Sequence, residues 1–317
     1  VSDPGSNEWE HVWGAESPDA TPAPYSWTLG YPGGYFQGAG DAHAYPRVPQ
    51  TGEANSFVRS LGRDTKPVFL SEYGIGSLSN VIRETRRFEQ AGARPDLVYA
   101  AHISSMADKL VADWEPFGFD GVYPFPEDML RDSQRLHARQ RLLGFDLIRS
   151  NPRINGCNLT HMLDDGMAGA GLWTFWREWK PGIVDALSDG WSPLRWCLFV
   201  DPLHGYVGRR FRVEAVLANE DVLGPVSYPV TFRISGPQGV VWEKHVDLRL
   251  PEPSPGEDAP LAVPTLCEEV SLAGPAGTYE FAANMDRRGA PAGGRLKFHI
   301  SDSAALPTVQ GGHTFGH

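Results

Sequence analysis

The sequence is poor in the features that mark several protein classes. It has only three cysteines, Cys157, Cys197 and Cys267, and they lie far apart in the chain. This spacing gives neither a disulfide framework nor a cysteine metal site, so we expect three buried free thiols and no bound metal. No run of apolar residues reaches the roughly 18 that a membrane-spanning helix needs, so no membrane partner is expected.

Basic residues are also scarce, since 28 Lys and Arg stand against 39 Asp and Glu, for a formal net charge of -11. No basic stripe could follow a phosphate backbone, which argues against nucleic acid as a partner. The first residues, Val1 to Gly5, lack the charged head and apolar core of a signal peptide, and there is no initiator Met. We therefore expect an N-terminal part of the same protein to be missing. Compartment, with secretion and the periplasm included, and oligomeric state stay open.

What the chain does have is length, aromatic residues and turn residues. Its 317 residues can form one large and one smaller domain, and 35 Gly with 27 Pro predict many loops. The sequence predicts a first domain over residues 1–190, a β-sandwich over 191–302 and a tail or truncated linker over 303–317. Residues 1–40 are rich in Gly, Pro and aromatic rings, and we expect a long loop that either packs on its own domain or lines a ligand groove.

One short apolar run is followed closely by a residue with a carboxylate side chain. Pro67 opens the run, Val68-Phe69-Leu70 predicts a buried parallel strand, and Glu72 comes where that strand should stop. Chemistry in parallel α/β folds is carried by the carboxyl ends of strands, so Glu72 is a catalytic candidate. The alternative is a strand-end glutamate that caps the next helix or pairs with an arginine.

A second strand is predicted just before it. Asp41, His43 and Tyr45 alternate with alanines, so a strand period of two places all three on one face, and Pro46 ends the pairing. A surface strand with a polar outer face is the alternative interpretation.

The rest of the first domain alternates helices and strands. Helical spacing predicts helices over residues 81–92, 97–114 and 127–150, the last with Arg and Gln on its outer side, and a short helix over 181–187. A strand is predicted from Ile154 to His161, and this rhythm is typical of parallel βα units. From Pro193 onward, about seven short strands separated by Gly-Pro turns predict the β-sandwich.

Three stretches in order resemble the catalytic barrel of glycoside hydrolase family 2. They are Asp41-Ala42-His43-Ala44-Tyr45-Pro46, the run from Pro67 to Gly74 with Ser71-Glu72-Tyr73-Gly74 at its end, and the run from Asn155 to Asp165. The resemblance implies that these are the sixth, seventh and eighth strands of a (β/α)8 TIM barrel. The expected fold class is therefore α/β, a partial barrel of about strands 5 to 8 followed by an immunoglobulin-like β-sandwich.

The resemblance also implies roles for single residues. Glu72 falls at the nucleophile position of a retaining glycosidase, which needs no cofactor and no metal. His43 and Tyr45 resemble a pair that contacts the sugar and holds the nucleophile by a hydrogen bond. The full set of expected carbohydrate-binding residues is Asp41, His43, Tyr45, Tyr73, His161, Asp164 and either Trp173 or Trp176, and a structural role is the alternative for each.

A retaining mechanism requires a second carboxyl as acid and base. Asn7-Glu8 matches the dipeptide that the family uses, but the preceding Ser2-Asp3-Pro4-Gly5-Ser6 does not predict a strand, so we expect this group upstream of Val1 and keep Glu8 as an alternative. The expected function is a retaining glycosidase, present here as a fragment that acts on a β-linked carbohydrate. The alternative is a non-catalytic carbohydrate-binding or scaffolding protein.

Overall fold

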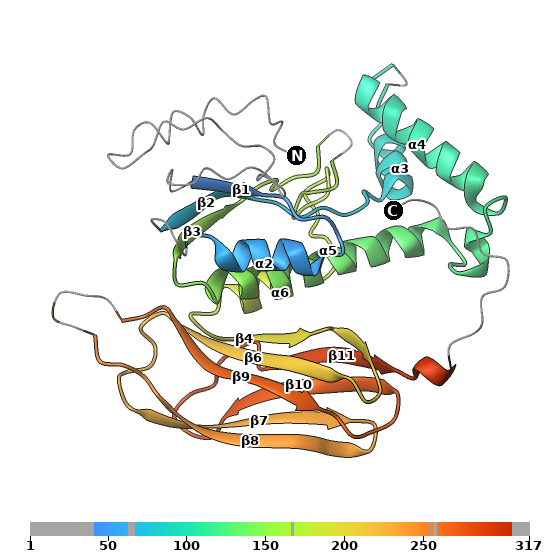
Figure 1. The fold of residues 1–317 in the computed structure, drawn as a ribbon. Coiled ribbons are helices and arrows are strands. Elements are labelled where there is room, and N and C mark those ends of the chain that lie inside the picture. Colours follow the sequence, from blue (N-terminus) through green and yellow to red (C-terminus); the bar gives the residue numbers. More distant parts are fainter. Residues whose placement is uncertain are drawn as a thin grey trace, which may run out of the picture. The chain divides into compact units, whose positions relative to one another are not determined.

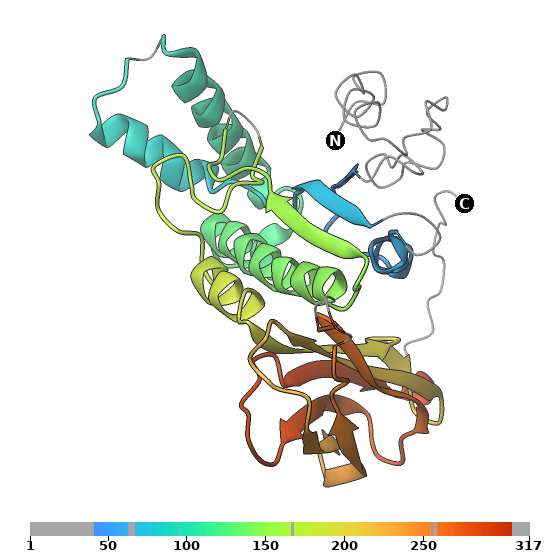
Figure 2. The same cartoon turned by 90° about the vertical axis from the view of Figure 1, so that its left-hand side faces the viewer.

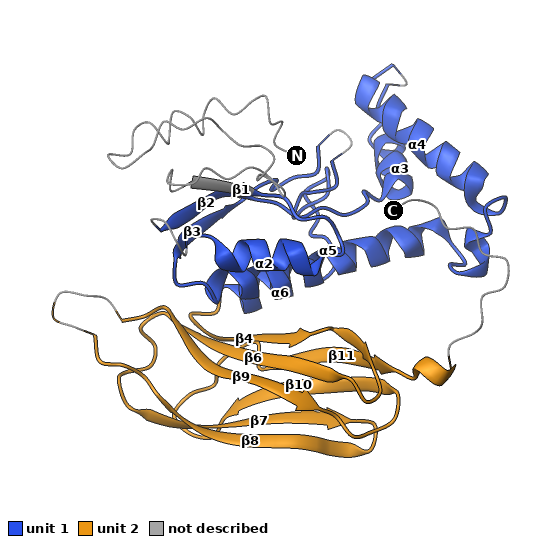
Figure 3. Cartoon of the chain, in the orientation of Figure 1, with its two compact units in different colours: residues 1–191 blue, residues 192–317 orange. Residues whose placement is uncertain are grey.

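The computed structural model describes residues 41–62, 67–94, 96–165, 168–253, 255 and 259–305. They belong to two compact units, residues 1–191 and 192–317 (Figure 3). The predicted loop of residues 1–40, with Glu8, lies outside the described residues, as does the tail after residue 305.

The first unit is built on a parallel sheet with the strand order β1-β2-β3. These strands are β1 (Asp41–Ala44), β2 (Val68–Tyr73) and β3 (Ile154–Leu159). Along β2, Val68 and Leu70 are buried, whereas Phe69 is 46% exposed, so the strand predicted to be apolar on both faces buries one face only.

Five α-helices accompany this sheet in the described residues: α2 (Gly52–Ser60), α3 (Val81–Gln90), α4 (Val98–Trp114), α5 (Pro126–Arg149) and α6 (Ile183–Gly190). A 3-10 turn, η3 (Phe119–Gly121), separates α4 from α5. Helix α5 runs along one face of the sheet with α6 packed against it, while α3 and α4 pack on each other (Figures 1 and 2).

The second unit contains two sheets. One has the order β5-β11-β10-β7-β8 and the other the order β4-β6-β9. Their bounds are β4 (Leu194–Asp201), β5 (His204–Tyr206), β6 (Arg210–Asn219), β7 (Ser227–Gly236), β8 (Gly239–Arg249), β9 (Ala262–Ser271), β10 (Gly277–Met285) and β11 (Arg295–Ser301), with a final 3-10 turn, η4 (Ser303–Ala305).

A single apolar core lies between these two sheets. Trp196 of β4 meets Phe232 of β7 with ring centroids 5.6 Å apart, and Phe281 of β10 stacks on Phe232. All three side chains are fully buried. Their alternation with polar neighbours along each strand is the period of two that buries one sheet face.

The predicted fold class is wrong. The described part of the first unit shows three strands in an open sheet, and across both units eleven strands accompany the five α-helices. Barrel closure requires strand number, tilt and stagger to agree around the whole ring, and the apolar pattern of single strands does not encode this. The second unit also departs from an immunoglobulin constant-type sandwich, which has four and three antiparallel strands. Here the sheets have five and three, and β5 pairs with β11 in parallel.

All three cysteines are free thiols, but only Cys197 is fully buried, and the exposed Cys267 corrects the prediction of three buried ones. Strand alternation explains the difference, because Cys267 takes an outward position on β9. No helix in the described residues is long and apolar enough to cross a membrane.

Candidate active site at the strand ends

Glu72 lies near the carboxyl end of β2, the central strand of the parallel sheet. Its neighbour in register on β1 is His43, which places the predicted strand pair side by side in the backbone. The side chains of Asp41 and His43 lie outside the described part of the structure. Ligands of open α/β sheets bind beyond the carboxyl ends of the strands, so Glu72 stands where this fold class places its chemistry.

Tyr45 is the side chain that holds Glu72. The half-buried hydroxyl of Tyr45 donates a short hydrogen bond to Oε2 of Glu72. Burial raises the pKa of Tyr45 above its usual range, and the hydrogen bond to the Glu72 carboxylate raises it further. Tyr45 therefore stays a neutral donor at physiological pH. The hydrogen bond from Tyr45 orients one carboxylate oxygen of Glu72.

Gly74 makes this placement of Tyr45 possible. A Cβ atom at Gly74 would lie 2.6 Å from the Tyr45 ring and 2.7 Å from Oγ1 of Thr160, the residue that follows β3. Any larger residue would displace the ring from Glu72. The Ser71-Glu72-Tyr73-Gly74 motif thus has a physical basis: its glutamate faces Tyr45 and its glycine admits the tyrosine ring.

Tyr73, which was expected to bind carbohydrate, faces the interior instead. It is 1% exposed, and its hydroxyl lies against Gly144 of α5 and accepts a hydrogen bond from Nε2 of Gln50 at 3.4 Å. Burial raises its pKa above the usual range. Adjacent strand residues point to opposite faces, so Glu72 and Tyr73 cannot both line one site.

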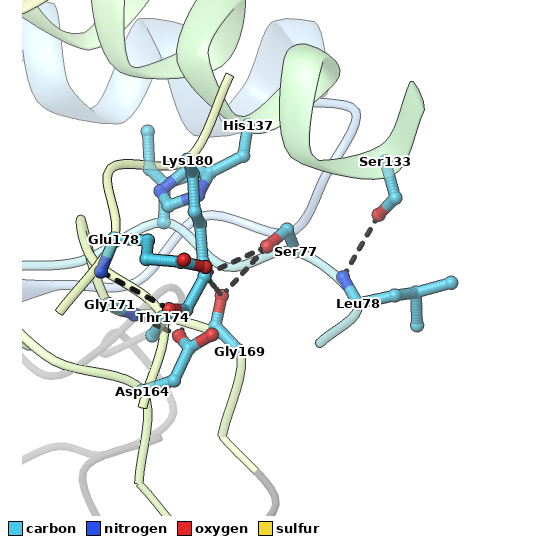
Figure 4. A network of polar contacts seen from close by, with 12 residues as sticks. Ser77, Leu78, Ser133, His137, Asp164, Gly169, Gly171, Thr174, Glu178 and Lys180 are labelled. Atoms are coloured by element: carbon cyan, nitrogen blue, oxygen red, sulfur yellow. Dashed lines mark hydrogen bonds and ion pairs between the residues drawn. The ribbon is translucent and has the colours of Figure 1, made fainter. Parts of the chain in front are cut away.

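Asp164 is held in a buried ion pair (Figure 4). Its Oδ1 atom accepts hydrogen bonds from Nζ of Lys180 at 2.7 Å and from the backbone N–H of Gly171 at 2.9 Å. Lys180 also donates to Oγ of Ser77 at 3.0 Å and to the carbonyl of Gly169 at 2.8 Å. Burial raises the pKa of Asp164 and lowers that of Lys180, while their contact opposes both shifts. The ion pair of Asp164 and Lys180 therefore joins the segment that follows β2 to the segment that follows β3.

Arg141 of α5 forms a second set of buried hydrogen bonds to the segments that follow β2 and β3. Its Nη2 atom donates to the carbonyls of Ile75 at 3.2 Å, Thr160 at 3.4 Å and Ala170 at 2.9 Å. Its Nε atom donates to Nε2 of His137 at 2.8 Å. Burial lowers the pKa of His137 to about 2, with the Arg141 charge adding to the effect, so the imidazole is a neutral acceptor. The segments that follow β2 and β3 are thus tied to α5 and to each other.

The two alternative tryptophans have different surroundings. Trp176 packs edge-on against Phe88 of α3, with ring centroids 5.1 Å apart, in the core of the helical pair. Trp173 instead meets Trp179 edge-on at 4.9 Å, and Trp179 is 48% exposed. His161 is exposed and has a positive φ of 62°, an uncommon backbone conformation for a residue with a side chain. An exposed ring suited to stacking is therefore Trp179, which the sequence did not single out.

Comparisons with known proteins identify no family for this chain. No family model matches it, and no curated protein matches it either. Among solved structures, the CARDB domain of a Pyrococcus furiosus protein in complex with di-metal ions is 15% identical with a TM-score of 0.24, over 34% of this chain and 91% of that one. The alkylpurine DNA glycosylase AlkC of Pseudomonas fluorescens is 11% identical with a TM-score of 0.25, over 65% of this chain and 48% of that one.

An FMN-binding β-glucuronidase from Facaelibacterium prausnitzii is 12% identical with a TM-score of 0.22, over 55% of this chain and 24% of that one. This chain therefore spans about a quarter of that enzyme and about half of the DNA glycosylase. All three TM-scores are too low to carry an argument about fold or function.

Sequence reasoning missed the buried charged residues that support the site. Arg141 was expected on the outer side of its helix, but it is 1% exposed, and Gln134 on the same helix is 4% exposed. Both fall on one helical row with the buried Leu130, Ala138 and Phe145, and this spacing is the signal that would have placed them inside. Lys180 has no comparable signal, because it lies in an irregular loop.

Proposed function

We propose that this protein is a retaining glycoside hydrolase that cleaves a β-linked carbohydrate with Glu72 as its nucleophile. The observation that carries the proposal is the hydrogen bond from Tyr45 to Glu72 at the carboxyl end of the central parallel strand. A carboxylate that a neutral phenol orients is suited to attack on an anomeric carbon. The proposed mechanism uses two carboxyl groups and no metal.

In the first step, Glu72 attacks the anomeric carbon, the bond from that carbon to the leaving oxygen breaks, and a second carboxyl protonates the leaving group. Water then attacks the glycosyl ester, that carboxyl takes its proton, and Glu72 is released. We do not assign the second role to Asp164, because its Oδ1 atom already accepts hydrogen bonds from Lys180 and Gly171. Trp179 supplies an exposed ring for stacking on a sugar face.

Replacing Glu72 with glutamine tests the proposal. Glu72→Gln keeps the size and a hydrogen-bond acceptor for Tyr45 but removes the nucleophilic charge. We expect turnover of a panel of aryl β-glycosides by the full-length protein to fall by about four orders of magnitude or more, as for loss of a catalytic nucleophile. The matched control is Glu53→Gln, an exposed glutamate of α2, and it should keep full activity.

Undiminished turnover in Glu72→Gln would refute the nucleophile role. Sugar binding without turnover in the unaltered protein would favour the non-catalytic carbohydrate-binding alternative.

A further inference from the structure

A groove with no assigned role lies between α4, the first turns of α5 and the loop that leads into α3. It encloses about 550 Å³, which is within the usual range for small-molecule sites of roughly 300–1,000 Å³. Its floor is formed by apolar side chains from these elements: Val81, Ile103, Met106, Leu110, Met129 and Leu130.

The floor remains open because α4 packs through a narrow face. Ala100, Ile103 and Ala107 of α4 are buried against α3 and α5, whereas Met106 is 37% exposed and Leu110 is half-buried. Leu78, at the rim, is 49% exposed. A ligand that removes apolar surface of this kind from water is bound favourably, because burial of the surface lowers the free energy of the complex.

The side chains of the groove indicate what kind of apolar group would fill it. None of its described lining residues is aromatic, and two are methionines, whose flexible thioethers adapt to an aliphatic chain. At about 30 Å³ for each water-sized group, about 550 Å³ holds about eighteen such groups, which is enough for a single aliphatic chain of ten carbons or more. The groove therefore favours a linear aliphatic chain over a planar ring system.

The charged side chains that line the groove indicate the net charge of its ligand. Among the described lining residues, the charged side chains are Lys109 and Asp113, which form an ion pair with each other one turn apart on α4. Because they compensate one another, this described lining offers no net charge to an anion or a cation. The other polar side chains of the described lining are the hydroxyls of Ser79 and Ser105, together with that of Ser77, which already accepts a hydrogen bond from Lys180. Such hydroxyls suit an uncharged head group that can donate and accept hydrogen bonds.

We propose that this groove binds an uncharged aliphatic alcohol or a similar neutral single-chain amphiphile, with its chain on the floor and its hydroxyl at the serine rim. The site is separate from Glu72 and does not rest on the proposed glycosidase activity. The lining comes from three segments of the first unit that the structure describes, so no partner chain is needed to complete it.

Displacement of tritium-labelled 1-decanol from the full-length protein by unlabelled 1-decanol tests the proposal. Saturable displacement by 1-decanol is expected, with decanoate and decyltrimethylammonium at least about tenfold weaker because the groove lacks a compensating charge for either. Met106→Lys places a charge on the floor of the groove and should weaken the binding of 1-decanol by about tenfold or more. Val111→Lys is the matched control, since Val111 is 56% exposed on the same helix and does not line the groove, and it should change the affinity less than twofold.

Equal effects of the two lysine variants would overturn the site, and equal binding of the charged and neutral chains would overturn the ligand class. A lack of saturable displacement would overturn both. Displacement that weakens as protein concentration rises would also overturn the proposal, because it would show that another copy of the chain covers the groove.

Discussion

At the scale of single residues, Glu84 is a buried acid with an incompletely satisfied carboxyl group. It lies on α3, is 4% exposed, and its Oε2 atom has no hydrogen-bond partner. Burial, together with the nearby carboxylates of Asp164 and Glu178, raises its pKa to about 7, although Arg83 and Lys180 oppose the shift. Glu84 is therefore protonated below neutral pH, next to the buried pair of Asp164 and Lys180.

This pKa predicts how stability depends on pH. The folded pKa of about 7 exceeds the ordinary value of 4.5, so the folded state binds the proton more tightly than the unfolded state. The free energy of unfolding should fall as pH rises from about 4.5 and reach its lower level above about 7. Glu84→Gln keeps a neutral side chain at every pH. From pH 5 to pH 9, its free energy of unfolding should therefore fall by on the order of 2–3 kcal/mol less than that of the unaltered protein.

Urea unfolding at pH 5 and pH 9 measures this difference, and Glu89→Gln, an exposed change on the same helix, is the control. Identical pH profiles for Glu84→Gln and the unaltered protein would contradict the assignment of a buried neutral acid.

At the scale of elements, the segments that carry the candidate site are held by buried cations. Arg141 joins the carbonyls of Ile75, Thr160 and Ala170 to α5. Lys180 donates directly to Oγ of Ser77, to the carbonyl of Gly169 and to Oδ1 of Asp164. Both bring the segment after β2 against the segment after β3, and Figure 4 shows the contacts of Lys180. The position of Glu72 at the end of β2 therefore depends on α5 as well as on its own strand.

Arg141→Met removes this fastening while keeping much of the side-chain volume. Three backbone carbonyls lose a donor, and each buried acceptor left without one costs about 1–3 kcal/mol, so we expect the free energy of unfolding to fall by about 3 kcal/mol or more. The matched control is Arg139→Met, an exposed position on the same helix, where a change within about 0.5 kcal/mol is expected. Urea unfolding at pH 7 provides the comparison, and equal losses in the two variants would show that Arg141 holds nothing together.

Much of the element structure could be predicted because local patterns determine it. Helix α5 runs from Pro126 to Arg149 where 127–150 was predicted, since Pro126 suits a first turn and Asn151-Pro152 stops the helix. The short α2 over Gly52–Ser60 was missed, because only Ala54 and Val58 of its nine residues are buried and the apolar period is too weak to detect.

At the scale of the whole molecule, the strands could be predicted from the sequence, but the way in which they assemble could not. The runs around Glu72, His43 and Cys157 are adjacent parallel strands, yet the barrel inferred from them is wrong. Strand-to-strand closure is a long-range property that no single apolar run records. The same limit applies to the site: Tyr45 could be placed near Glu72 from the pattern and the resemblance, whereas the Lys180 contacts join segments about a hundred residues apart and leave no local trace.

Covalent trapping is the most direct test of Glu72 as the nucleophile. The full-length protein is incubated with a panel of 2,4-dinitrophenyl 2-deoxy-2-fluoro-β-glycosides, which slow release of a glycosyl-enzyme more than its formation. We expect an intact-mass increase of one fluoroglycosyl group, located on Glu72 by peptide mapping and absent from Glu72→Gln. Turnover of β-glycosides without such an adduct, or an adduct on another carboxylate, would contradict Glu72 as the nucleophile.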